Sequence, residues 1–484
     1  MAGIGIELNK IFARKSLISY LGGYTAAAMI FTGPVVLGII LLVFVHLLSS
    51  FGGASPVAKD IIVVIITYSL IASMVLNNIF ATTVTRYIAD LLYTNKTKRI
   101  MPALHGAILV QLVLSIIIWG PFMIFCGAGP LYSILGFIFF CELGVVWTLI
   151  SFISAVKDYV RIIAVFAAGV GAAILFGFLL VYFTHMDVIV SLLIAVYLGY
   201  GVMALGYFDA LKRYFPESEG GLFRFVEYFF LYPQLSLIGM CLSIGLFSHF
   251  VVVWYGPYGM QNIGLFRSAP LYDVPALFAF LTTLLTTISF STTTEVNFYP
   301  AYKNYYDLLN TNGSLQAINI AERDMLIILR RELLYLAFKQ FLITLLFCTI
   351  GSTLLAEIGV GGLNTTSLGL FRELSVGYGI FASANGILLV LFYFANYRIA
   401  LLSVSFFAAG TLGFSLFFTL TKANISSLGF SISAGAIVMY IVALFSLWNY
   451  TNKLQYNIFS KQPLLAEVHH GPLYHRFKRL WSDP

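Results

Sequence analysis

The sequence predicts an all-α polytopic membrane protein with about 12 transmembrane helices in two pseudo-symmetric six-helix bundles. Two observations predict this fold class: a series of apolar runs of roughly 20 or more residues each, and a composition of 60% hydrophobic and 10% charged residues. About 20 helical residues cross a ~30 Å hydrocarbon core, and soluble domains carry about 25% charged residues. The chain therefore leaves no room for an ordinary soluble enzyme domain. The runs are 20–49, 60–84, 103–126, 131–154, 160–183, 187–207, 229–252, 274–299, 333–356, 375–397, 399–421 and 427–449.

The basic residues lie mostly at one end of these runs, which sets the orientation. With a cytoplasmic N-terminus, 23 of the 27 Lys and Arg residues fall on the cytoplasmic side, leaving Lys59, Arg267, Arg372 and Lys422 on the other. Such an excess is typical of cytoplasmic loops. The even number of runs agrees, so both termini are expected in the cytoplasm. The net charge of +7 then serves topology and contact with membrane lipids rather than nucleic acid.

Neither a cofactor nor a metal site is expected. The four cysteines lie within or at the edges of apolar runs without CxxC spacing, which favours small buried apolar residues. The histidines of the C-terminal tail lack acidic or cysteine partners at ligand spacing. P-loop, dinucleotide and nucleophile-elbow motifs are missing from the sequence. We therefore expect a protein that is not an enzyme.

A short repeat supports the division into halves. Asp90 to Asn95 reads DLLYTN and Asp307 to Asn312 reads DLLNTN, five matches in six at an offset of 217 residues. The copies follow the second and eighth runs, which a six-plus-six repeat would pair. Parallel repeats are a transporter architecture with the substrate path between the halves. The domains predicted are a bundle at 1–207, a cytoplasmic linker at 208–226, a bundle at 227–450 and a basic tail at 451–484.

The connection between Ala301 and Glu332 permits two interpretations. Its apolar residues, among them Ala321, Met325 and Leu329, recur near helical spacing between charged residues. This pattern predicts an amphipathic helix on the membrane surface or against a partner. An extension of the following span accounts for it equally well.

Glu142 is the ionisable residue closest to the middle of a run, within Phe139 to Gly144. A carboxylate deep in lipid costs several kcal/mol, and such groups usually face a cavity or a partner. Glu142 is therefore a candidate for ion coupling. A static contact with a neighbouring helix is the competing interpretation.

Two runs that the repeat pairs, 60–84 and 274–299, carry polar stripes at helical spacing. Polar stripes in membrane helices line a wet cavity or join helices through hydrogen bonds. Hydroxyl and amide groups in such number suit a hydroxyl-rich substrate such as a sugar. The candidate substrate-path residues are Ser73, Asn77, Asn78, Arg86, Thr286, Thr287, Thr294 and Glu295. Proline permits a bend in a membrane helix, which makes Gly33, Pro34 and Pro275 candidate bend positions.

The opening Met1 to Ile11 (MAGIGIELNKI), followed by Gly33-Pro34 in the first run, resembles the PelG family of Pel exopolysaccharide transport proteins. The resemblance covers the whole chain in length and number of spans. It implies a flippase-like fold of the multidrug/oligosaccharidyl-lipid/polysaccharide superfamily in the cytoplasmic (inner) membrane. It also implies export of an amino-sugar polymer. The partners implied are a cytoplasmic glycosyltransferase and membrane subunits of the Pel system, including a cyclic di-GMP sensor.

We therefore predict that the chain transports an exopolysaccharide through a cavity between two bundles, in concert with a glycosyltransferase. Two alternatives within transport are a lipid-linked oligosaccharide flippase and a cation-coupled exporter on the same scaffold. A lipid-linked pyrophosphate would require several cations in the spans, which are nearly free of Lys and Arg. A third alternative is a non-transporting membrane scaffold for the synthase, docked through the 301–332 connection.

Overall fold

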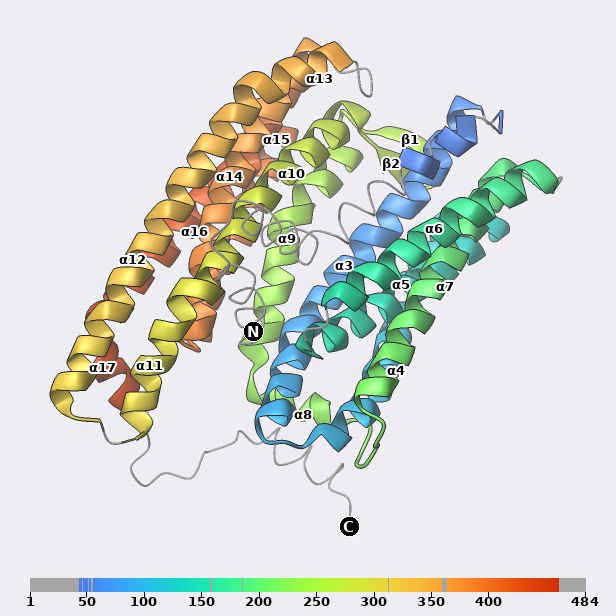
Figure 1. Cartoon of the computed structure of the whole chain (residues 1–484). Coiled ribbons are helices and arrows are strands. Elements are labelled where there is room, and N and C mark those ends of the chain that lie inside the picture. Colours follow the sequence, from blue (N-terminus) through green and yellow to red (C-terminus); the bar gives the residue numbers. More distant parts are fainter. Residues whose placement is uncertain are drawn as a thin grey trace, which may run out of the picture. The chain divides into compact units, whose positions relative to one another are not determined.

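The computed structural model is a helical membrane protein, shown in Figure 1. It describes residues 43–45, 47–50, 52–53, 55–156, 159–184, 186–311, 313–358 and 364–460. Within these residues, 11 helices are long and apolar enough to cross a membrane. They correspond to the second to twelfth predicted runs, and the predicted all-α membrane fold is confirmed. Most of the first run, with Gly33 and Pro34, lies outside the described residues.

The described residues form two compact units. The first, here called the first bundle, contains the described residues up to Phe247 together with Gly259–Ser268. Its elements are α3 (Pro56–Tyr93), η1 (Thr97–Arg99), α4 (Ile100–Phe125), α5 (Pro130–Val156), α6 (Tyr159–Phe183), α7 (Val188–Tyr214), η2 (Arg224–Val226), α8 (Glu227–Leu231), the first part of α9 (Pro233–Tyr255), β1 (Met260–Ile263) and β2 (Phe266–Ser268).

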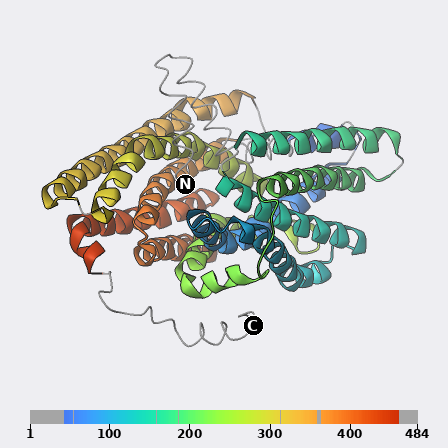
Figure 2. The same cartoon turned by 60° about the horizontal axis from the view of Figure 1, so that its bottom comes forward.

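The second unit, the second bundle, contains Ser248–Tyr258 and the described residues from Ala269 onward. Its helices lie side by side in both views (Figures 1 and 2). Its elements are the end of α9, α10 (Pro270–Thr293), η3 (Thr294–Phe298), α11 (Tyr299–Asn310), α12 (Leu315–Leu346), η4 (Phe347–Gly351), α13 (Ser352–Ile358), α14 (Thr365–Tyr393), α15 (Tyr397–Leu420), α16 (Ile425–Asn452) and α17 (Leu454–Phe459). The domain boundaries drawn from the sequence stay a prediction.

Polar contacts hold the start of α9 against α3 in the first bundle. Asn78 Nδ2 donates to Ser243 Oγ at 3.0 Å, and Thr82 Oγ1 donates to the Leu235 carbonyl at 2.9 Å. The helices approach so closely at Gly239 that a Cβ there would stand 1.9 Å from the Asn78 carbonyl oxygen. Small residues permit this approach, and side-chain hydrogen bonds then join the helices inside the apolar layer.

A two-stranded antiparallel hairpin, β1 and β2, packs on the first bundle although it lies between α9 and α10 in the sequence. Tyr68 of α3 holds it: the Tyr68 hydroxyl donates to the Arg267 carbonyl at 3.0 Å and accepts from the Arg267 N–H at 3.2 Å. The ring of Phe266 meets the rings of Tyr68 and Phe122 edge-on. Strands of four and three residues between apolar helices gave no sequence signal for this hairpin.

The repeated hexapeptide forms the same helix end in each bundle. Thr94 ends α3 and Thr311 ends α11, and each threonine N–H and hydroxyl donates to the carbonyl of the aspartate four residues earlier. The next bond also matches, because Lys96 N–H donates to the Leu91 carbonyl and Gly313 N–H to the Leu308 carbonyl. This six-to-one bond belongs to the Schellman helix terminus. The repeat therefore encodes equivalent helix ends.

The described residues of the connection predicted at 301–332 are helical, apart from Thr311, Gly313 and Ser314. One helix runs from Pro270 to Asn310 and the next from Leu315 to Glu357, 41 and 43 residues long. At 1.5 Å per residue each spans about 60 Å, whereas a bilayer with its headgroups measures about 45 Å. These lengths agree with an extension of the membrane spans, and both interpretations of the 301–332 connection stay predictions.

The core of the second bundle lies around α14. This helix contacts α10, α12 and α16, and 78% of its most apolar segment is buried. The fully buried side chains there include Phe371, Tyr378 and Tyr272. Because α14 is surrounded, a polar residue on it must face a neighbouring helix or a cavity.

The close approach at Gly239 gives a direct test of the first bundle. We expect Gly239→Ala to lower the thermal unfolding midpoint, since the added methyl group cannot fit against the α3 backbone. Gly171→Ala on α6 is the matched control, because a Cβ there meets nothing within 4 Å. Removing glycine from a helix interior should leave that control unchanged or stabilise it by about 0.5–1 kcal/mol. Equal midpoints for the two variants would contradict the packing described.

Candidate substrate pocket and buried polar residues

A pocket of about 220 Å³ lies inside the second bundle between α10, α12 and α14. Its polar lining comes from Thr287 and Ser291 of α10 and from Asn385 of α14. Phe290 and Phe392 supply aromatic walls, and the remaining lining residues are aliphatic or small. Ligand pockets commonly combine a mostly apolar wall with a few polar groups that fix orientation.

The pocket exists because the three helices meet at a glycine. A Cβ at Gly386 would stand 2.3 Å from Leu336 Cδ2 of α12 and 3.1 Å from Phe290 Cε1 of α10. Both neighbours are buried, with 4% and 6% of their surface exposed. Glycine thus brings α14 close to α10 and α12, and larger side chains on either side of it line the pocket.

Polar side chains continue from the pocket along α10 and α12. Lys339 Nζ donates to Ser289 Oγ at 3.0 Å. This bond gives a polar partner to a lysine that lies in an apolar segment. Asn297 Nδ2 donates to Glu332 Oε1 at 2.9 Å, and Arg331 Nη2 lies 3.5 Å from the same oxygen. Thr286 and Thr294 differ, because among the described residues neither buried hydroxyl has a hydrogen-bond partner.

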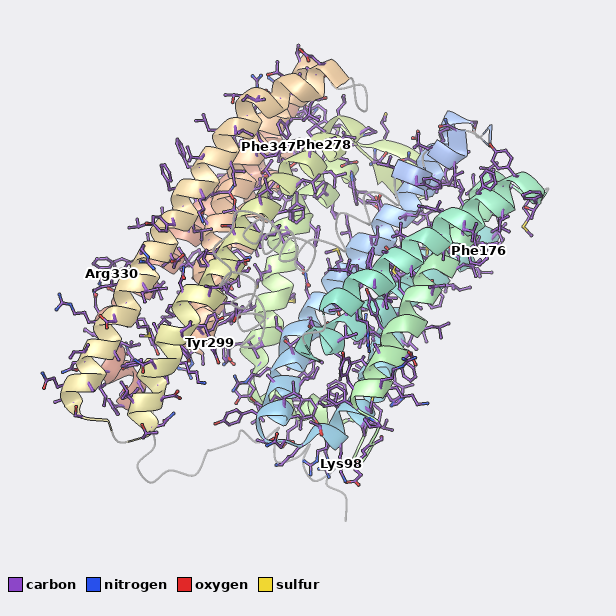
Figure 3. The ribbon with its side chains drawn as sticks, viewed as in Figure 1. Lys98, Phe176, Phe278, Tyr299, Arg330 and Phe347 are labelled. Carbon is purple, nitrogen blue, oxygen red and sulfur yellow. The ribbon has the colours of Figure 1, made fainter. Side chains whose placement is uncertain are left out.

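The helix is irregular next to these residues. Thr294–Phe298 form a π-helical turn, η3, between α10 and α11. Glu295 in this turn is 4% exposed, and its Oε1 accepts a hydrogen bond from the Tyr393 hydroxyl at 2.9 Å. Single π-helical turns occur frequently at functional sites. Figure 3 shows Tyr299 where this turn passes into α11.

The candidate path residues of α3 lie in the first bundle. Ser73 is fully buried and accepts a hydrogen bond from Trp147 Nε1 of α5 at 3.1 Å, while Asn78 bonds Ser243. Arg86 pairs with Asp90 at 3.3 Å, with about 40% of its side chain exposed. Ser73 and Asn78 therefore both join helices, which is one of the two roles expected of a polar stripe.

Asn77 lies beside a narrow crevice of the first bundle with Gln111, Thr148 and Ser151. Its volume is about 10 Å³, which is the space of a single water molecule. The Gln111 amide is 1% exposed, and neither of its polar atoms has a protein partner in the described part of the chain. A buried amide without partners is costly, so an ordered water suits this crevice.

Glu142 lies on α5 and faces α7. A side chain at Gly201 would meet Glu142 Oε1 at 3.2 Å, and Tyr197 and Tyr200 lie on the same stretch of α7. Glu142 Oε2 and the Tyr197 hydroxyl are both buried without a hydrogen-bond partner among the described residues. Among the described residues Glu142 forms no ion pair, and its position against α7 leaves both ion coupling and a static contact with a neighbouring helix as predictions.

The structure brings only some of the predicted residues together. Thr286, Thr287, Thr294 and Glu295 share one stretch of α10 and η3, and Thr287 alone lines the pocket. Pro275 lies near the start of α10, which continues through it. Sequence reasoning missed Asn385, although an amide in an apolar run was a visible signal. Its partners Phe290 and Phe392 were hidden among 44 phenylalanines.

His249 is a second residue that sequence reasoning missed. Its imidazole is fully buried in the second bundle, with Tyr272 Oη 2.8 Å from Nδ1 and Tyr378 Oη 3.2 Å from Nε2. Among the described residues, no three or more His, Cys, Asp and Glu side chains cluster as metal ligands would. The arrangement is therefore a set of hydrogen bonds between three helices.

The fold resembles that of solved membrane transporters. A multidrug resistance MATE transporter of the MOP superfamily matches in its outward-facing form at 13% identity and a TM-score of 0.56, over 89% of this chain and 96% of that chain. Its inward-facing form matches at 13% identity and a TM-score of 0.58, over 86% and 95%. A MOP superfamily transporter from Pyrococcus furiosus matches at 12% identity and a TM-score of 0.55, over 89% and 96%. Such low identities show the fold alone.

The sequence identifies the family within this class. The family model PelG, described as "Putative exopolysaccharide Exporter (EPS-E)", matches residues 1–459. The chain therefore belongs to the PelG family, and its role is membrane transport. Comparison with curated proteins gives no match.

Proposed function

We propose that this chain exports an amino-sugar exopolysaccharide, and that the pocket between α10, α12 and α14 holds one sugar residue of the polymer. The pocket lining is the observation that supports this proposal: two hydroxyls, one amide and two phenyl rings around about 220 Å³. The chain acts as a transporter and not as an enzyme. The family match supports a polysaccharide as the substrate class.

The lining matches the two kinds of surface that a sugar ring carries. Hydroxyl and amide groups both donate and accept, so Thr287, Ser291 and Asn385 can pair with ring hydroxyls or an acetamido group. The phenyl rings of Phe290 and Phe392 offer apolar area for the C–H face of a pyranose. The lining contains no charged side chain. Binding through neutral groups is weaker than binding through charges, which suits a polymer that must move on through the transporter.

The partners belong to the same proposal. A growing polymer must reach the transporter from its synthase, so we assign a cytoplasmic glycosyltransferase as the partner that supplies it. Membrane subunits of the Pel system, one of them a cyclic di-GMP sensor, would regulate that supply. The cytoplasmic membrane is the site of action in this proposal, and membership of the PelG family supports it.

Substitutions in the pocket test the assignment. We expect Asn385→Leu and Phe392→Leu each to lower polymer secretion roughly tenfold, since one lost hydrogen bond or ring contact costs about 1–1.5 kcal/mol. Val376→Ala, at an exposed position of the same helix, is the matched control. Secreted polymer is measured in cells that express each variant at equal level. Wild-type secretion by both pocket variants would refute the sugar site.

Ion coupling at Glu142 is a second proposal, which rests on a separate observation. The buried Oε2 of Glu142 and the Tyr197 hydroxyl both lack partners in the described structure. An uncompensated carboxylate in a membrane helix is costly unless it binds a proton or another cation. We infer that such binding at Glu142 links transport to an ion gradient.

Glu142→Gln separates ion coupling from a static role, because glutamine keeps the shape and cannot carry a negative charge. We expect the variant to secrete several-fold less polymer and to lose the response of secretion to an imposed proton or sodium gradient. Glu357→Gln, at an exposed position of α13, is the control. If Glu142→Gln secretes normally and keeps the wild-type gradient response, Glu142 has no part in coupling.

A further inference from the structure

We propose that the first bundle carries a binding site for the phosphate-bearing headgroup of an anionic phospholipid, in a pocket at the end of α3, α4 and α7. The pocket measures about 560 Å³ and is lined by the turn after α3, by η1 and by the loop between α7 and η2. It is separate from the polymer pocket, which lies in the second bundle. Figure 3 shows Lys98 at this end of the first bundle.

The pocket carries more positive than negative charge. Four cationic side chains line it, Lys96, Lys98, Arg99 and Arg224, against two carboxylates, Glu217 and Glu219. Lys98 Nζ lies 3.0 Å from a carboxylate oxygen of each glutamate, so this one lysine forms an ion pair with both carboxylates. Within the described residues, neither Lys96 nor Arg99 has an ion-pair partner. Those two cations remain available to an anion.

Hydrogen bonds and ion pairs join the walls of the pocket to each other. The Glu219 N–H donates to the Lys98 carbonyl at 2.9 Å, which ties the α7–η2 loop to η1. The two ion pairs of Lys98 reinforce this link, and Phe225, which follows the loop, is fully buried. A ligand therefore meets a preformed site and does not have to order two loops, which favours binding.

The position of the pocket along the membrane normal favours a lipid headgroup over a free ion. Helices α4 and α7 have 26 and 27 residues. At 1.5 Å per residue they are about 40 Å long, which matches the hydrocarbon core plus its polar margins. Their ends, where the pocket lies, therefore reach the level of the lipid phosphates.

Exposed aromatic residues flank the same end. Tyr93, at the end of α3, is 90% exposed and Tyr214, which lines the pocket, is 39% exposed. Tyrosines of this kind are typical of the membrane interface, and basic pockets between membrane helices bind anionic headgroups. The volume also far exceeds that of one phosphate group, and leaves room for the glycerol that a phospholipid attaches to it.

The test measures binding of dihexanoyl phosphatidylglycerol to the purified full chain by thermal shift and native mass spectrometry. Dihexanoyl phosphatidylcholine and inorganic phosphate are the comparison ligands. We expect stabilisation by phosphatidylglycerol, weaker at high salt, and none by the other two at the same concentration. Equal stabilisation by phosphatidylcholine would show a nonspecific lipid effect. Displacement of the lipid by equimolar inorganic phosphate would show a free-phosphate site. Either result overturns the proposal.

Two variants with opposite expected effects make the test specific. Arg99→Gln should weaken binding at least tenfold, and Lys96→Gln, at an exposed position, should act in the same direction without affecting folding. Glu217→Gln combined with Glu219→Gln frees Lys98 and keeps the backbone bond from Glu219 N–H to the Lys98 carbonyl, so the walls stay joined and binding should strengthen. Lys212→Gln, at an exposed position of the same bundle end outside the pocket, is the control. If all variants bind like this control, the site does not exist. The measurement does not depend on polymer transport, so its outcome is distinguishable from that of the proposed function.

Discussion

The hydrocarbon core of a bilayer contains no water to bond polar groups. This constraint determines both the secondary structure of the spans and the pairing of their polar side chains. It forces the described spans into helices, since only there can each backbone N–H and carbonyl pair within its own segment. It also explains why the polar side chains come in pairs across helices. Asn78 with Ser243, Lys339 with Ser289 and Asn297 with Glu332 each satisfy a group that lipid could not. Close approaches such as that at Gly239 bring the helices near enough for these bonds.

The same constraint separates structural polar residues from candidates for function. A buried polar group that has a hydrogen-bond partner on another helix has a structural role. A buried polar group without such a partner is costly unless it bonds a water molecule, an ion or a substrate. Ser73 and Asn78 belong to the first kind. Thr286, Thr294 and Glu142 belong to the second, as judged among the described residues. The pocket proposed to hold a sugar is lined in part by α10, which carries Thr286, whereas Glu142 lies in the other bundle. The two proposals, for substrate binding and for ion coupling, therefore concern different bundles.

The sequence predicted the membrane helices well, because runs of apolar residues report lipid contact directly. It also located the equivalent helix ends of Thr94 and Thr311, since a C-terminal cap is a local property of six residues. The β1–β2 hairpin and the π-helical turn at Thr294 were not predicted, because both depend on packing against other elements. The pocket could not be predicted for the same reason: Phe290, Leu336 and Asn385 are far apart in sequence and meet only through the fold. The polar stripes indicated α10, which lines the pocket with Thr287, Phe290 and Ser291, whereas Asn385 on the facing helix α14 was not singled out.

The central claim is that this chain is the export step for a polysaccharide. The most direct test is the location of the polymer in cells that lack this chain and retain the synthase, measured as amino-sugar polymer in washed cells and in lysate. The account predicts that polymer, or a lipid-linked intermediate of it, is trapped inside. Normal secretion by these cells would contradict the claim.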